Sequence, residues 1–110
     1  MAREQSDLLR GTLDLLILRT LAAAPMHGWA LGQSIQHQSE NLLRVGQGSL
    51  YPALQRLEQQ GWIESEWRTT EQNRPAKYYT LTASGRRALA TETRNWRQYV
   101  RAVDLILEGA

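Results

Sequence analysis

The chain has 110 residues and a formal net charge of +2, a length that corresponds to one domain or one subunit of a larger assembly. It contains no cysteine, which excludes structural disulfides, a thiolate nucleophile and a cysteine-ligated metal. The N-terminus is polar and charged, and no apolar stretch reaches the roughly 18 residues of a membrane span. We therefore expect a cytoplasmic protein with no membrane contact.

The basic residues of the chain are almost all arginine. Of the 13 basic residues, twelve are Arg and one, Lys77, is Lys. The planar guanidinium suits bidentate contacts with phosphates and guanine edges. An arginine-rich proteome gives the same bias, so the composition permits DNA binding without requiring it.

The first third of the chain has helical periodicity. Residues 1–7 are predicted to form a loose arm, and residues 8–24 a helix with an apolar stripe of Leu9, Leu13, Leu16, Ile17, Thr20 and Leu21, widened by Leu15 and Leu18. A turn is expected at residues 26–28, and then a second helix over residues 27–38 that directs inward Trp29, Leu31, Ile35 and Ala30. The connector over residues 41–48 contains candidates for a short strand, namely Leu42, Leu43 and Val45.

The stretch QGSLYPALQRL at residues 47–57 predicts a third helix, running from residue 49 to residue 60. Ser49 is the expected N-cap, Pro52 is expected in the first turn, and Gly61 supplies the left-handed stop. The apolar side follows the i, i+3, i+4, i+7 pattern with Leu50, Ala53, Leu54 and Leu57. The opposite side carries hydrogen-bonding groups that suit a DNA groove, on Gln47, Ser49, Tyr51 and Gln55. An ordinary surface helix with a leucine stripe is the simpler alternative.

The periodicity then changes from 3.6 to 2. Residues 62–68 and 76–81 are predicted strands, joined by a polar loop over residues 69–75 that contains the turn formers Asn73 and Pro75. In the first strand, Ile63, Ser65 and Trp67 share one face. The two strands form a predicted β-hairpin with a basic tip.

Thr82 is the expected cap of a last helix over residues 83–108. Its apolar residues have the a/d spacing of a coiled-coil seam: Leu89, Thr93, Trp96, Val100, Val103 and Leu107, broadened by Tyr99 and Ile106. No later apolar segment covers this seam, so a second copy of the chain is the expected cover. We predict a DNA-binding domain at residues 1–81 and a dimerisation helix at residues 82–110.

Three helices, a hairpin and a helix are the order of a winged helix-turn-helix, an α+β and mostly α fold. The chain resembles PadR-type transcriptional regulators in the motifs LRGTLDLLIL (9–18), HGW (27–29), GSLYPALQRLE (48–58), RPAKYY (74–79) and LTxxG (81–85). The single C-terminal helix resembles the short subfamily. The resemblance implies a homodimeric repressor that binds an inverted repeat in double-stranded DNA. It also implies release by a small molecule, and phenolic acids and cationic drugs are known inducer classes of the family.

The resemblance also implies roles for individual residues. Those that match the recognition helix and the position just before it are Ser49, Tyr51, Gln55 and Gln47, and those that match the wing are Arg74, Lys77 and Tyr78. His27 matches the start of the second helix, where a phosphate is bound. Two residues depart from the family pattern: Trp29 replaces a common Tyr, and Pro75 replaces a residue that is often basic.

Several of these residues have structural alternatives. Tyr51 could pack against the wing, Arg56 could form an ion pair with Glu66 or near Glu58 in place of a phosphate contact, and Trp96 could be a coiled-coil core residue. In the functional interpretation, Trp96 and its two-fold mate frame a cavity for a flat aromatic or drug-like effector. The small neighbours Ala88, Thr93 and Ala102 favour such a gap, and its candidate walls are Leu13, Ile17 and Val100.

The sequence contains no catalytic or metal-binding constellation. His27 and His37 lack cysteine or carboxylate partners at ligand spacing, and Ser49 lacks a His–Asp arrangement. Glu64 and Glu66 are expected to be solvated on the hairpin. We expect no cofactor, no metal and no enzymatic activity. A winged-helix module that binds proteins, and a dimer that binds or converts small molecules without DNA specificity, remain the alternatives.

Overall fold

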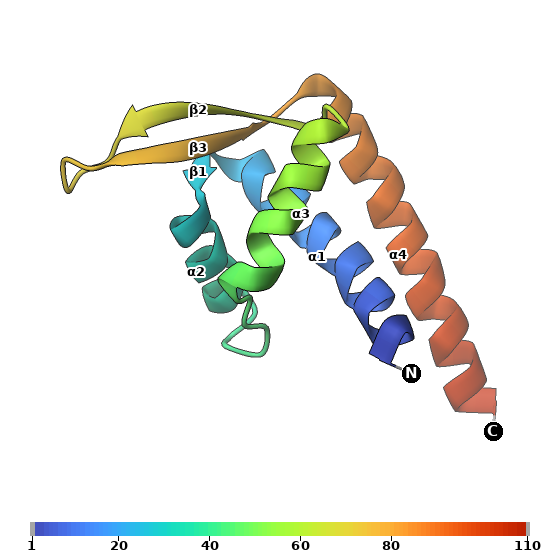
Figure 1. Cartoon of the computed structure of the whole chain (residues 1–110). Coiled ribbons are helices and arrows are strands. Elements are labelled where there is room, and N and C mark those ends of the chain that lie inside the picture. Colours follow the sequence, from blue (N-terminus) through green and yellow to red (C-terminus); the bar gives the residue numbers. More distant parts are fainter. Residues whose placement is uncertain (1, 110) are drawn as a thin grey trace.

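The computed structural model describes the backbone of residues 2–109 and the side chains of residues 11–109. Its elements are α1 (Ala2–Ala23), β1 (Met26–His27), α2 (Gly28–Gln38), α3 (Gln47–Gln59), β2 (Ile63–Thr69), β3 (Pro75–Leu81) and α4 (Ala83–Gly109). In Figure 1, α1 lies at the centre with α2 and α3 beside it, while the β2–β3 hairpin projects to one side and α4 lies on the other. The predicted α+β winged-helix architecture with a long C-terminal helix is confirmed.

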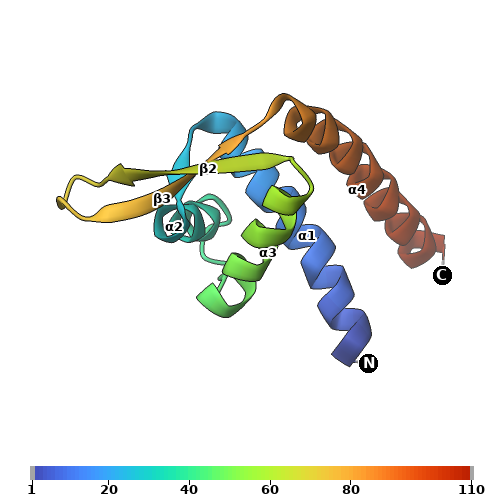
Figure 2. The same ribbon diagram turned by 45° about the horizontal axis from the view of Figure 1, so that its top comes forward.

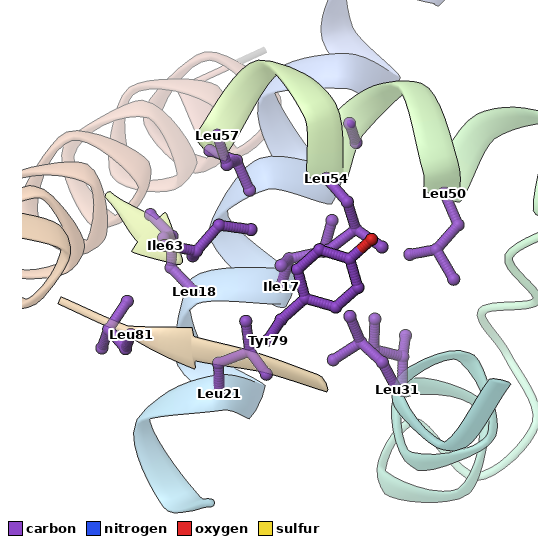
Figure 3. Packing of buried hydrophobic residues seen from close by; sticks show 12 residues of the cluster. Ile17, Leu18, Leu21, Leu31, Leu50, Leu54, Leu57, Ile63, Tyr79 and Leu81 are labelled. Carbon is purple, nitrogen blue, oxygen red and sulfur yellow. The ribbon is translucent and has the colours of Figure 1, made fainter. Parts of the chain in front are cut away.

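One core joins the helices to the base of the hairpin. Ile17, Leu18 and Leu21 of α1 meet the leucine row of α3, and the side chains of Leu31, Ile63, Tyr79 and Leu81 close the cluster (Figure 3). The predicted apolar side of α3 is buried throughout, at Leu50, Ala53, Leu54 and Leu57. Burying one face of α3 in this way leaves its other face in solvent.

The sheet has three strands in the order β1-β3-β2, one more than predicted. Met26 and His27 pair antiparallel with Tyr79 and Tyr78, so part of the predicted turn at residues 26–28 is a short strand. A two-residue strand is too short to show a period in the sequence. This strand forms because the distant strand β3 pairs with it. The pairing fixes the start of α2 beside the hairpin.

The structure overturns two predictions about irregular segments. Residues 2–7 continue α1 and are not a loose arm, because the segment AREQSD contains no Gly or Pro and begins with good helix formers. Met1 and the side chain of Leu9 lie outside the described residues. The connector after α2 contains turns and no strand, and Leu42 in it is 85 % exposed, because Glu40 and Asn41 adopt positive φ.

The start of α3 also differs from the prediction. The helix begins at Gln47 with Gly46 as N-cap, and the Gly46 carbonyl accepts the N–H groups of Ser49 and Leu50 at 3.1 and 3.0 Å. Ser49 is therefore inside the helix and is not its cap. Pro52 is the sixth residue of the helix and not part of its first turn, so the Gly48 carbonyl has no N–H at i+4.

The end of α3 and the start of α4 are joined by hydrogen bonds. Gly61 (φ +77°) ends α3 as predicted, with the N–H of Trp62 bonded to the Leu57 carbonyl at 3.1 Å. Thr82 caps α4 as predicted: its hydroxyl accepts the Gly85 N–H at 3.0 Å and donates to the Gly61 carbonyl at 2.7 Å. From this junction α4 runs to the C-terminus apart from α2 and the hairpin (Figure 2).

Candidate nucleic-acid interface

The solvent face of α3 holds the four predicted recognition residues. Gln47, Ser49, Tyr51 and Gln55 are all exposed, because the opposite side of the helix is buried in the core. They supply amide, hydroxyl and phenol groups, which can bond to base edges and phosphates. The structure thus leaves all four residues accessible on the part of α3 that is outside the core.

Tyr51 also holds the two helices of the helix-turn-helix together. A Cβ on Gly28, the first residue of α2, would lie 2.8 Å from the Tyr51 hydroxyl oxygen and 3.0 Å from its ring. The phenol therefore rests on the backbone of α2, where only glycine leaves room for it. The side chain is still 44 % exposed, so it serves packing and remains available to a ligand.

His27 forms the N-cap of α2. Its Nδ1 accepts the Ala30 N–H at 3.2 Å, so in the neutral ring the remaining proton is on Nε2. The ring lies edge-on to Tyr78, with centroids 5.2 Å apart, and stacks on Trp29 at 6.4 Å. The ring therefore keeps one donor, the Nε2–H, beside the start of α2.

Trp29 was expected to face inward, and this is wrong: it is 64 % exposed. The buried row of α2 is Gly28, Leu31 and Ile35, and Trp29 lies about 100° away from Gly28 around the helix. Its indole N–H is therefore directed to solvent beside His27 and not into the core.

The predicted wing residues divide between the two faces of the hairpin, because neighbours along a strand point in opposite directions. Lys77 faces α3, where its Nζ lies 3.8 Å from Oε1 of Glu58. Tyr78 is on the other face, where the Arg68 guanidinium lies 5.2 Å from its ring centroid. Arg74 is exposed at the hairpin tip, next to Asn73 with φ of 60°.

Arg56 lies apart from the other candidates. Its guanidinium forms a 2.8 Å ion pair with Asp14 of α1, not with Glu66. Both side chains are partly buried, and the pair joins the back of α3 to α1. The structure therefore gives Arg56 a role in holding the helices, at a distance from the polar face of α3.

An open groove of about 1160 Å³ lies between the hairpin and the starts of α2 and α3. Its lining brings together most of the predicted residues with others that the sequence did not single out: His27, Gly28, Trp29, Tyr51, Trp67, Thr70, Glu71, Gln72, Arg74, Pro75, Ala76, Lys77, Tyr78 and Tyr79. Trp67 was missed because it alternates with core residues, yet it is 70 % exposed since the hairpin extends beyond the helices. The groove combines aromatic surfaces with cations, as nucleic-acid interfaces do.

Tyr79 closes the inner end of this groove as a core residue. Burial, with smaller contributions from Glu58 and Tyr51, raises the pKa of its hydroxyl above the ordinary value of 10.0. The phenol is therefore neutral over the physiological range. It contributes packing and no charge to the groove.

The predicted seam on α4 is covered only at its start. Leu89 and Thr93 are partly buried, and α1, which precedes the seam in the sequence, contacts α4. The rest is open to solvent: Trp96 is 39 % exposed, and the exposed apolar row continues with Tyr99, Val100, Val103, Leu105, Ile106 and Leu107. These exposed apolar side chains lie on consecutive turns of α4.

A hollow of about 460 Å³ lies on this part of α4, and its lining includes two of the predicted effector-site residues, Trp96 and Val100. The Trp96 ring stacks on Tyr99 with centroids 6.1 Å apart. Leu13 is partly buried against the core, and Ile17 is fully enclosed within it. Of the four predicted residues, Trp96 and Val100 therefore lie on the exposed side of α4, whereas Leu13 and Ile17 lie at or in the core.

Other kinds of site find no support in the part of the chain that the structure describes. No group of three or more His, Asp or Glu side chains there is placed to hold a metal ion. No helix among the described residues is long and apolar enough to cross a membrane.

Comparisons with known proteins agree on one family. Residues 17–91 match the model of the transcriptional regulator PadR-like family. The chain is 36 % identical to the transcriptional regulator Rv3488 of Mycobacterium tuberculosis over 94 residues, which covers 86 % of this chain and 84 % of that protein. Among solved structures, a PadR family transcriptional regulator from Eggerthella lenta is 33 % identical with a TM-score of 0.80, covering 99 % of this chain and 93 % of the other. A transcriptional regulator from Clostridium thermocellum is 26 % identical with a TM-score of 0.81, over 89 % and 95 % of the two chains.

Proposed function

Since the chain belongs to the PadR-like family of transcriptional regulators, we propose that it acts as a homodimeric repressor on an inverted-repeat operator. Regulators of this family bind DNA and are not enzymes. The observation that carries the proposal is the polar, exposed face of α3 beside an open groove that contains Arg74 and Lys77. We also propose that it works in the cytoplasm, together with the DNA that it binds.

In the proposed complex, α3 enters the major groove and the hairpin follows the backbone beside it. Gln47, Ser49, Tyr51 and Gln55 contact base edges or the nearest phosphates. The phosphate contacts come from His27, Arg74, Lys77 and Tyr78, and from Arg56 once a phosphate competes with Asp14. This division follows the positions of the residues on the face of α3 and around the groove.

We assign dimerisation to residues 82–110 and DNA binding to residues 1–81. One recognition helix reads only a few base pairs, so two copies related by a two-fold axis double the sequence that is read. The exposed apolar row of α4 supports this assignment, because an unpaired row of such length favours association. The seam of the dimer would consist of Leu89, Thr93, Trp96, Val100, Val103 and Leu107.

We further propose that a small aromatic or drug-like effector releases the repressor. Among the residues whose side chains are described, the hollow beside Trp96 and Val100 is lined by α4 alone, and a second α4 would enclose it. A flat ligand would then stack on the paired indoles, with Leu13 and Ile17 behind them. A ligand with higher affinity for the free dimer than for the DNA-bound one lowers operator occupancy.

Fluorescence anisotropy of a labelled duplex from the upstream region of the protein's own gene tests this function. A scrambled duplex is the control, and both are titrated at several salt concentrations. We expect tight binding to the upstream duplex only, with an affinity that falls steeply as salt rises, because bound cations release counterions from phosphate. Equal affinity for both duplexes, or binding that salt does not affect, would contradict a sequence-specific DNA regulator.

Tyr51→Ala is expected to abolish specific operator binding while the domain remains folded, since Tyr51 lies outside the buried core. The affinity for the operator should fall to that for the scrambled duplex. Tyr51→Phe is the matched control, because it keeps the ring on Gly28 and removes only the hydroxyl. Thermal unfolding of both variants checks the fold, and Tyr51→Ala binding the operator as tightly as wild type would disprove the assignment.

Lys77→Ala is expected to weaken binding to operator and scrambled duplex by the same factor. A phosphate contact carries no sequence information, so the ratio of the two affinities should stay constant. The slope of log affinity against log salt should become shallower by less than about 0.9, the contribution of one full phosphate contact, because the ammonium shares its contact with Glu58. A loss confined to the operator would show that Lys77 reads bases.

A further inference from the structure

One carboxylate joins the recognition helix to both strands of the hairpin. Glu58 lies in the last turns of α3, and its Oε2 accepts a 2.6 Å hydrogen bond from the Ser65 hydroxyl of β2. Its Oε1 lies 3.8 Å from the Lys77 ammonium of β3. Ser65 and Lys77 therefore meet the same side chain on the face of the hairpin that looks toward α3.

This arrangement places a negative charge beside a cation of the DNA-binding surface. About two fifths of the Lys77 side chain and one third of the Glu58 side chain remain exposed, so a phosphate can reach the ammonium. The ammonium would then exchange part of its contact with Glu58 for a contact with DNA. Binding to any duplex is weakened by this exchange, whatever its sequence.

We propose that Glu58 is a positioning residue that holds Lys77 and the hairpin against α3 and lowers the affinity for DNA of unrelated sequence. The inference rests on the proposed DNA-binding surface and adds a function for a residue that makes no direct DNA contact. The hydrogen bond to Ser65 keeps the carboxylate in place, and the charge of the carboxylate acts on Lys77. Because a phosphate contact carries no sequence information, Glu58 lowers the affinity for operator and for unrelated DNA by the same factor.

The test compares Glu58→Gln with wild type on scrambled duplex at several salt concentrations. The amide keeps the size of the side chain and an oxygen for Ser65, and removes the charge. We expect affinity to rise about two- to fivefold, the range of a surface ion pair. The slope of log affinity against log salt should become steeper, toward the value for one full phosphate contact at Lys77, by less than about 0.9.

Two further variants isolate the contact with Lys77. In a Lys77→Ala background, Glu58→Gln should give no gain, because the cation that the carboxylate restrains is absent. Glu64→Gln removes the same charge from the exposed, opposite face of β2 and should leave affinity unchanged. Thermal unfolding of each variant confirms that the fold is intact.

An unchanged or lower affinity of Glu58→Gln would overturn the inference. An equal gain in the Lys77→Ala background, or from Glu64→Gln, would overturn it as well, because the effect would then be one of overall charge. If wild type itself shows no salt-dependent binding to either duplex, the proposed function fails together with the inference. Salt-dependent binding by wild type with no gain from Glu58→Gln leaves the function intact and rejects the role of Glu58.

Discussion

Gly85→Ala is expected to destabilise the protein by about 3 kcal/mol, the upper part of the usual range for forcing an extra group into a packed site. A Cβ at this position would overlap the carbonyl oxygen of Trp62 and lie 2.6 Å from Cδ1 of Leu81. The Trp62 oxygen is a backbone atom that accepts the Thr82 N–H at 3.0 Å, so it cannot move aside without breaking that bond. The start of α4 must shift instead, and its cap at Thr82 is lost with it.

Thermal unfolding at fixed protein concentration measures this effect, and a fall in Tm of roughly 12 °C or more is expected. Gly48→Ala is the matched control, because nothing lies within 4 Å of a Cβ there and the residue is helical. In a helix this change stabilises by about 0.5–1 kcal/mol. Equal Tm values for Gly85→Ala and wild type would show that α4 does not start against Trp62 in solution.

Val103→Glu is expected to convert the proposed homodimer to monomers and to reduce operator affinity by at least about 100-fold. Both copies would place a carboxylate in the apolar seam, where a charge without a partner is strongly unfavourable. Losing the second recognition helix then removes the gain that comes from binding two half-sites at once, about 10²–10⁴-fold for linked sites. Val103 is already 36 % exposed in the single chain, so the monomer should remain folded.

Sedimentation velocity measures the oligomeric state, and fluorescence anisotropy on the same samples measures the operator affinity. Gln98→Glu is the control with the same added charge, because residue 98 is about 140° from residue 103 around α4 and outside the seam. It should stay dimeric and bind the operator like wild type. A dimeric Val103→Glu would place the dimer interface elsewhere.

The sequence was sufficient for the elements whose causes are local. Gly61 and Thr82 were predicted as stop and cap from single residue types, and both make the expected hydrogen bonds. The leucine row of α3 carries its own period, which burial confirms, and the alternation of β2 is borne out by burial over residues 63–66 but not at Trp67. These predictions needed no knowledge of distant parts of the chain.

Several of the errors occur where a distant segment of the chain decides the local structure. Met26 and His27 form a strand because β3 passes beside them, with their partners Tyr79 and Tyr78 lying 53 and 51 residues later in the sequence. Arg56 pairs with Asp14, 42 residues away, and not with the nearby glutamates. Trp29 and Trp67 look like core residues by type, yet the positions of α2 and the hairpin tip leave them exposed. The contacts of Glu58 with Ser65 and Lys77 likewise depend on α3, β2 and β3 meeting in space.

The hydrogen bonds of Thr82 connect the end of α3 to the start of α4. Because its hydroxyl bonds to Gly61, just after α3, and to the start of α4, we expect a rotation of α4 to move the end of α3. The 27 residues of α4 form an arm of about 40 Å, so a tilt of about 5° displaces one end relative to the other by about 3.5 Å. That displacement is close to the rise of one base pair, about 3.4 Å. In the proposed homodimer, a change of a few degrees in the angle between the two α4 helices is therefore enough to move the recognition helices out of phase with the operator.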